Sequence, residues 1–165
     1  MTAPNAMTRR LAQLRFLPEA VRMRVVSQIL GRYVPYVGHS GLLYEELTPE
    51  RVVVSIRNRR PTRNHIGNVH AAAMALLAET STGFVVAMNL PDDRLPLIKS
   101  FTVDFRKRTK GDMRAVATLS AEQIAHIQAT PKGELAVPVT VTDATGGEPI
   151  HCTMLWAWIP KKPKA

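Results

Sequence analysis

The feature that most constrains the fold of this chain is an apolar segment that contains a single carboxylate. From Val69 to Glu79, ten of the eleven residues are histidine or apolar types, and the last is Glu79 itself. The segment from Asn68 to Thr82 is apolar almost all round, which predicts a helix enclosed by other elements. A charged side chain in such a helix is costly unless it is paired or functional. Glu79 is therefore the first candidate for a catalytic group.

Strand-like segments surround this predicted helix. They cover residues 41–47, 51–57, 97–107, 113–119, 134–143 and 149–159. Thr48-Pro49-Glu50 is typical of a hairpin turn, and Ser120 with Gln123 forms a capping box for a short helix over 121–129. Residues 80–83 erode the central helix after Glu79, and residues 84–89 either extend it or begin a strand. An antiparallel sheet curved around one long helix is the economical way to bury that helix, so we expect an α+β fold.

The length of 165 residues suits one main domain with a short appendage. Apolar residues at helical spacing predict an amphipathic helix from Pro18 to Arg32. We therefore expect an N-terminal extension over 1–33 and the main domain over 34–165. The N-terminal residues lack the apolar run of a signal peptide, and no uninterrupted apolar segment reaches the roughly 20 residues that span a membrane. A cytoplasmic protein without a membrane partner is expected.

The single cysteine, Cys152, allows no intramolecular disulfide and no metal site built on several cysteines, so no metal is expected. The formal net charge of +9, from 22 Lys and Arg against 13 Asp and Glu, points to an anionic partner. Aromatic residues make up only 5% of the chain and form no stacking set on the predicted strands, which argues against a nucleic acid. An idle basic surface is the alternative.

The order of the predicted elements, together with the pattern Asn64-x5-His70-Ala71-Ala72-x6-Glu79, resembles the hotdog-fold acyl-CoA thioesterases of the phenylacetyl-CoA and 4-hydroxybenzoyl-CoA type. In that family an Asn precedes a His-Gly-Gly at the start of the central helix, and an acidic residue follows one to two turns later. The resemblance extends from Val34 to Pro160 and is strongest to a subgroup of mostly unassigned substrate. Alanines replace the glycine pair here, and the Ala71 methyl group would narrow or reposition the thioester pocket.

This resemblance implies a hotdog fold and hydrolysis of an acyl-CoA thioester to the free acid and coenzyme A. Glu79 would act as base or nucleophile. The Ala71 N–H at the helix N-terminus would stabilise the oxyanion, with Asn64 as a second donor or water ligand and His70 in contact with substrate. Coenzyme A would be part of the substrate, and no cofactor is expected. Its phosphates would pair with basic residues from Arg60, Arg63, Arg106, Lys107 and Arg108.

Other interpretations remain open for the same residues. Glu79 could simply bond to an Arg or to the hydroxyls that follow it, His70 could begin the helix, and Asn64 could be a turn or cap residue. His65 lies fourteen residues before Glu79, as in the hotdog dehydratases, but their His-Phe-Pro pattern is absent. A hydratase or dehydratase and a non-catalytic acyl-CoA-binding protein are therefore the alternative functions.

The spacing between Ala71 and Glu79 bears on the oligomeric state. Eight residues along one helix separate the two groups by about 12 Å, too far to reach opposite sides of one carbonyl. They can share a substrate only if two copies of the helix lie antiparallel across a two-fold axis, which is the arrangement in the resembled family. We therefore expect a homodimer or a dimer of dimers (a homotetramer).

Overall fold

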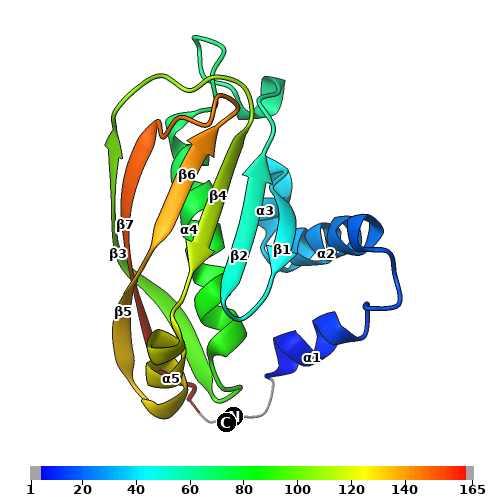
Figure 1. Ribbon diagram of the computed structural model, residues 1–165, viewed down its shortest axis with the longest axis vertical. Helices are drawn as coiled ribbons and strands as arrows, with labels where there is room; N and C mark the ends of the chain where they lie inside the picture. The colour runs from blue at the N-terminus through cyan, green and yellow to red at the C-terminus, as the bar shows by residue number, and fades with distance from the viewer. Residues whose placement is uncertain (1–4, 163–165) are drawn as a thin grey trace.

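A computed structural model describes residues 5–162 and shows one long helix, α4 (Ala71–Asn89), partly enclosed by two antiparallel sheets (Figure 1). One sheet has the strand order β1-β2-β4-β6 and the other has the order β3-β7-β5. The four strands of the first sheet are Leu43–Leu47, Arg51–Ile56, Met113–Thr118 and Val139–Asp143, and those of the second are Arg94–Phe105, Ile150–Pro160 and Gly133–Val137. The predicted α+β architecture is confirmed.

The core lies between α4 and the concave faces of the sheets. Leu77, Ala78, Val85 and Val86 of α4 have no exposed surface. By length and composition α4 would be able to span a membrane, but 56% of its most apolar window is buried inside this protein. Its apolar character is that of a core helix, as the residue pattern predicts.

The central helix is longer than predicted, because it continues past Thr82 to Asn89. The hydroxyls that indicated an ending instead donate to a backbone carbonyl of the same helix: Ser81 Oγ and Thr82 Oγ1 lie 3.0 and 2.9 Å from Ala78 O. Gly83 allows the ring of Trp156 to approach, since a Cβ at this position would lie 2.6 Å from a ring carbon. These small and polar residues therefore serve tertiary packing, not helix termination.

The single strand predicted over 134–143 is wrong, because Pro138 divides it into two. The part before Pro138 is β5, which pairs with β7, and the part after it is β6, which pairs with β4. Proline lacks the N–H that a continuous ladder needs. Its carbonyl accepts from the Thr118 N–H at 3.2 Å. The chain thus moves from one sheet to the other at this residue.

Two local predictions are confirmed. The turn between β1 and β2 is closed by Thr48, whose N–H donates to Arg51 O at 2.9 Å and whose Oγ1 accepts from Arg51 N–H at 3.0 Å. Helix α5 (Ala121–Ala129) begins with the expected capping box: Ser120 Oγ accepts from Gln123 N–H at 3.2 Å, and Gln123 Oε1 accepts from Ser120 N–H at 2.9 Å.

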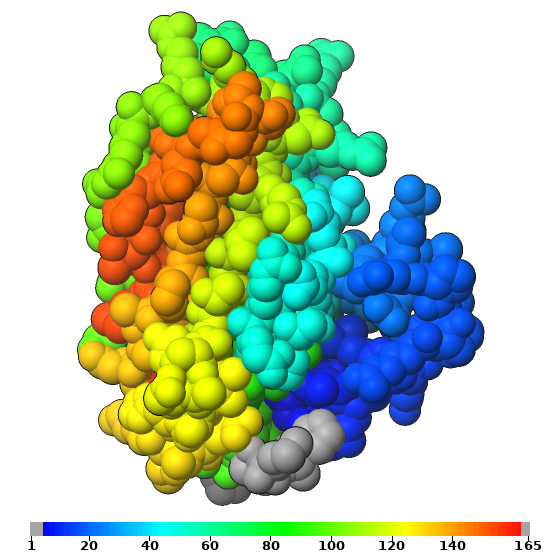
Figure 2. Space-filling model, viewed as in Figure 1, coloured from blue at the N-terminus to red at the C-terminus, as the bar shows by residue number. Residues whose placement is uncertain are grey.

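The N-terminal part contains more helices than the sequence predicts. Besides the expected helix, α2 (Glu19–Tyr33), there are α1 (Ala6–Ala12) and α3 (Pro35–Ser40), and a 3-10 turn, η1 (Arg60–Thr62), precedes α4. Figure 2 shows the N-terminal residues, in blue, standing at one side of the body. The outer ends of the predicted segments 1–33 and 34–165 fall outside the described residues.

The N-terminal helices are tied to the last turn of α4. Asn5, which caps α1, donates from Nδ2 to the carbonyls of Ala87 and Leu90, each at 2.7 Å. Val26 of α2 and Val37 of α3 are buried members of the core. The Asn5 bonds fix α1 against the part of α4 that follows Glu79, and the burial of Val26 and Val37 anchors α2 and α3 in the core.

We expect Thr82→Val to destabilise the protein by about 1–3 kcal/mol, because the isosteric change leaves a buried indole N–H without an acceptor. Trp156 Nε1 donates to Thr82 Oγ1 at 2.9 Å, and both residues are buried. Denaturant unfolding measures the loss. The exposed Thr118→Val is the control and should change the free energy of unfolding by less than about 0.5 kcal/mol. Equal effects of the two changes would contradict the role of this bond.

Candidate active site

Glu79 lies in a groove between α4 and the N-terminal helices. The groove has a volume of about 550 Å³, and Thr80, Gly83 and Phe84 of α4 line it together with Glu79. Burial raises the pKa of the Glu79 carboxyl, while a hydrogen bond from Thr80 Oγ1 at 3.4 Å acts in the opposite direction. A carboxylate held in this way is a stronger base than an exposed one while it remains ionised. The alternative, purely structural role considered for Glu79 is a bond to an Arg or to the hydroxyls that follow it. The bond to the Thr80 hydroxyl is present, so part of this alternative holds as well.

Tyr44 is a candidate that the sequence did not single out. Its side chain is 2% exposed and packs edge-to-face on Phe84, with ring centroids 4.9 Å apart. Its hydroxyl has no hydrogen-bond partner within the described residues. Burial raises the pKa of Tyr44, and the negative charge of Glu79 raises it further. Alternation along β1 places Tyr44 on the inward face, but no sequence signal places it near a residue on the central helix.

The start of α4 presents one free backbone donor. His70 is the N-cap residue, and its Nδ1 accepts from Ala72 N–H at 3.1 Å. Its carbonyl accepts from the N–H groups of Ala73 and Met74. The Ala71 N–H makes no hydrogen bond to any described residue, and Ala71 is exposed. His70 thus begins the helix, which is the structural role considered for it as an alternative. The Ala71 N–H lies at the positive end of the helix dipole and has no partner among the described residues.

Asn64 organises the loop before α4. Its Oδ1 accepts from the N–H groups of Ile66 and Asn68, each at 3.1 Å. The turn role considered for Asn64 is therefore present. Its Nδ2 makes no hydrogen bond within residues 5–162, which leaves this amide as a free donor. His65, in the same loop, is exposed.

The predicted site residues do not come together within one chain. Ala71 and Glu79 are eight residues apart on the regular helix α4, which separates them by about 12 Å. The basic residues Arg106, Lys107 and Arg108 are exposed beyond the end of β3, and Arg60 and Arg63 are exposed in the loop before α4. In Figure 1 both loops lie at the end of the molecule where α4 begins.

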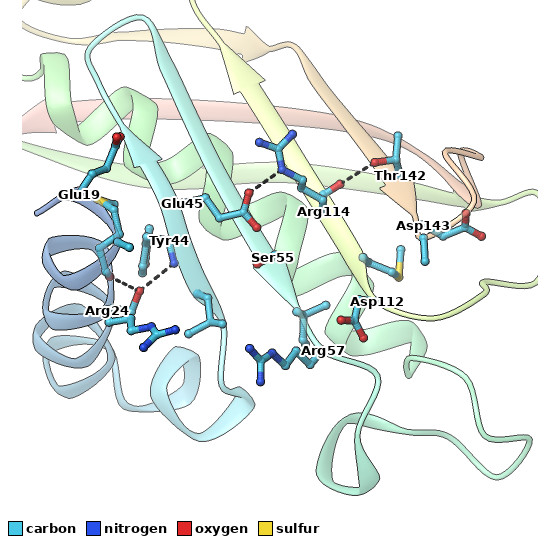
Figure 3. A pocket seen from close by; sticks show the side chains of 17 residues that line it. Glu19, Arg24, Tyr44, Glu45, Ser55, Arg57, Asp112, Arg114, Thr142 and Asp143 are labelled. Atoms are coloured by element: carbon cyan, nitrogen blue, oxygen red, sulfur yellow. Dashed lines mark hydrogen bonds and ion pairs between the residues drawn. The ribbon is translucent and has the colours of Figure 1, made fainter.

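A second cavity, of about 810 Å³, lies between α2 and the four-stranded sheet (Figure 3). Within it Arg114 Nε donates to Glu45 Oε2 at 2.6 Å. Tyr44 lines this cavity, but none of the residues that the sequence predicts for the site does. The cavity shares no lining residue with the groove that contains Glu79.

Other chemistry has little support in this part of the chain. Among residues 5–162, no group of three or more His, Cys, Asp or Glu side chains could hold a metal ion. Burial, with the charge of Asp104, raises the pKa of the Cys152 thiol to about 11, which makes it a poor nucleophile at neutral pH. The Glu79 groove thus remains the candidate site.

Residues 22–159 match a protein family described as a domain of unknown function, DUF4442. The chain belongs to this family. The match includes most of α2, as well as both sheets and the central helix. No curated protein matches the chain.

Several solved structures resemble this DUF4442 member. A Pseudomonas aeruginosa protein described as a "Protein of Unknown Function" and "Probable Thioesterase" is 27% identical, with a TM-score of 0.74 over 88% of this chain and 97% of that one. A thioesterase family protein from Silicibacter pomeroyi is 15% identical, with a TM-score of 0.65 over 87% and 100%. A thioesterase from Haemophilus influenzae is 13% identical, with a TM-score of 0.64 over 84% and 90%. The predicted hotdog fold and the thioesterase-like superfamily are confirmed.

We expect Glu79→Gln to stabilise the fold at neutral pH. The raised pKa of Glu79 means that ionisation costs the folded state stability above that pKa, and this cost vanishes below the ordinary pKa of an unfolded glutamate. The melting temperature of the variant should therefore exceed that of the wild type at pH 7, and the gain should shrink as the pH falls. The exposed Glu148→Gln is the control and should show neither effect. A variant less stable than wild type at neutral pH would contradict the desolvation argument.

Proposed function

We propose that this DUF4442 member hydrolyses acyl-CoA thioesters to a free acid and coenzyme A. The observation that carries the proposal is the partly buried carboxylate of Glu79, which lines an apolar groove on the central helix of a hotdog fold. The thioesterase names of structurally similar proteins support the reaction class.

In the proposed reaction, the Glu79 carboxylate takes a proton from a water molecule whose oxygen attacks the thioester carbon. The C–S bond then breaks, the electron pair leaves with sulfur, and the proton passes from Glu79 to the departing thiolate. Direct attack by the carboxylate, followed by hydrolysis of the anhydride, gives the same products. The carbonyl oxygen becomes negative in both routes, so a preorganised N–H donor would stabilise it.

The required donor would come from a second copy of the chain. Across two antiparallel α4 helices, the partner subunit's Ala71 N–H and the partner subunit's Asn64 amide would face Glu79. The Ala71 N–H and the Asn64 side-chain NH₂ have no hydrogen-bond acceptor within residues 5–162, which supports this assignment. The first turns of α4 are rich in alanine, and such small side chains allow two helices to approach closely.

Strand β3 supports the dimer independently. It is a twelve-residue edge strand, so its outer hydrogen-bonding groups are unpaired within the described chain. Phe101 and Phe105 pair in register with the buried Met154 and Ile150 of β7, and therefore point toward the same concave side. They are nevertheless 52% and 56% exposed. A second β3 strand alongside would extend the sheet and bring a second α4 against this apolar surface.

The basic loops at the start of α4 are the proposed seat of the coenzyme A phosphates. Arg106, Lys107 and Arg108 follow β3, and Arg60 and Arg63 precede α4. Arg63 is held in place by Asn58, whose Oδ1 accepts from Arg63 Nε at 2.9 Å. Guanidinium groups suit phosphate because they bind it in a bidentate manner.

We expect purified protein to release free thiol from at least one acyl-CoA and Glu79→Gln to abolish the release. The amide cannot accept the proton or attack the carbon, so a loss of at least about 100-fold in kcat is expected. Thiol release from a panel of acyl-CoAs measures it, and Glu148→Gln should keep full activity. Undiminished activity of the Glu79 variant on the best substrate would remove the catalytic assignment. Binding of several acyl-CoAs without cleavage would favour a binding protein.

Mixed dimers test the shared site. Asn64→Asp keeps the acceptor that the loop needs but removes the amide donor, and Glu79→Gln removes the base. We expect each variant to be inactive alone and a refolded equal mixture to recover about a quarter of wild-type activity, because about half the dimers are mixed and each mixed dimer has one intact site. If both groups act within one chain, every site keeps a lesion. No recovery after verified subunit exchange would rule out the two-fold site.

A further inference from the structure

The part of α4 beyond Glu79 faces a mostly apolar groove that the N-terminal helices complete. Phe84 and Ala87 line it from α4, Leu11 from α1, Leu14 from the turn after α1, and Ile29 and Leu30 from α2. Ten residues of helix separate Glu79 from Asn89, so the wall that α4 provides extends for about 15 Å past the carboxylate. The groove is therefore longer than a single aromatic ring requires.

Polarity divides along α4 at Glu79. The loops at the N-terminal end of the helix carry exposed arginines and lysines, whereas the groove beside its C-terminal half is lined mainly by aliphatic and aromatic side chains. A ligand with an anionic head, a central reactive bond and an apolar tail would match these three regions in order. An acyl thioester of coenzyme A has this arrangement.

The far end of the groove is polar, and two of its cations are bonded to backbone carbonyls. Arg94 donates from one guanidinium nitrogen to the carbonyls of Ile127, Gln128 and Thr130, and Lys161 Nζ donates to Asp92 O at 2.7 Å. An apolar chain gains nothing by extending into this region, since its polar groups would lose contact with water. The polar end therefore sets a limit on chain length.

Apolar surface in the groove is left uncovered in the free chain. Ile29 is 50% exposed, and Tyr33, one turn later on α2, is exposed as well. Both line the groove. An apolar ligand would bury this surface with a gain of roughly 25 cal/mol per Å².

We infer that the groove binds the acyl chain of the substrate and that this chain is an aliphatic one of medium length. The inference rests on the proposed function, because that function places the thioester at Glu79. The N-terminal helices α1 and α2 then act as the specificity element: the groove beside them, not the machinery at the start of α4, selects the acid.

A direct binding experiment separates this inference from catalysis. The thioether S-dodecyl-CoA has no bond to hydrolyse, and its dissociation constant can be compared with that of coenzyme A by calorimetry. We expect the alkyl chain to tighten binding at least about tenfold, with a negative heat-capacity change. Ile29→Asn should reduce this gain about fivefold. Val21→Asn is the matched control, since Val21 lies on the same helix, is 47% exposed and does not line the groove, and it should leave the gain unchanged.

Turnover of butanoyl-, octanoyl-, dodecanoyl- and hexadecanoyl-CoA supplies the second measurement. We expect kcat/KM to peak at an intermediate chain length, and Ala87→Phe, which shortens the groove, to move the peak to shorter chains. Its melting temperature verifies folding. An equal loss on all chain lengths would contradict the groove assignment.

The outcomes for the groove and for the reaction are distinguishable. Tight, Ile29-dependent binding of the thioether without cleavage of any acyl-CoA would support the groove and overturn hydrolysis. The groove assignment would be overturned, and hydrolysis left intact, if thiol were released with equal kcat/KM from all chain lengths and if Ile29→Asn and Val21→Asn had the same affinity for S-dodecyl-CoA. A change of oligomeric state in Ile29→Asn, with unchanged chain-length dependence, would show that a second copy covers the groove and would also overturn the inference.

Discussion

The need to cover a helix that is apolar on nearly every side governs this fold. Nineteen residues of α4 cannot be buried by one flat sheet, because a flat sheet contacts only one face of a helix. Two curved sheets cover most of α4, and helices α1, α2 and α3 pack beside its last turns. Gly83 and Thr82 allow Trp156 to pack directly against the helix. The geometry of the candidate site follows from this enclosure.

A buried carboxylate in such a helix lowers the stability of the folded protein, but the same loss of solvation makes the carboxylate a stronger base. Burial raises the pKa of Glu79 because water no longer solvates its charge fully. Among the described residues its one side-chain hydrogen-bond partner is the hydroxyl of Thr80 at 3.4 Å, which compensates only weakly. The unpartnered hydroxyl of Tyr44 is a second polar group placed in the core near this charge. Polar groups left unsatisfied in a core are expected at functional sites.

The sequence predicts the parts of this structure that depend on local periodicity. The central helix, the hairpin turn at Thr48 and the capped helix α5 follow from spacing and cap chemistry. The later turns of α4 stay undecided between helix and strand in the sequence, because Ser81 and Thr82 resemble a helix end until the indole of Trp156 is known to lie beside them. The move between sheets at Pro138 is likewise a tertiary event.

In the candidate site too, some residues can be predicted from local sequence and others depend on tertiary packing. Glu79 stands out because its neighbours are apolar, and the start of α4 stands out because of the family pattern. The sequence does not indicate Tyr44 or the groove residues of α1 and α2, because they come from segments far from Glu79 along the chain. Tertiary packing alone brings them near Glu79: Tyr44 packs on Phe84 of α4, and Asn5 ties α1 to the end of the same helix.

The position of β7 has a consequence for how the molecule is made. This strand is the last of the chain, yet it is the middle strand of its sheet, paired with β3 on one side and β5 on the other. During synthesis from the N-terminus, β3 and β5 therefore have no strand between them until residues 150–160 have left the ribosome. Until then the Trp156 side of α4 has no cover, which exposes apolar surface to aggregation. A chain that ended before Ile150 would lack the strand that joins β3 to β5, so the second sheet cannot form until β7 has been made.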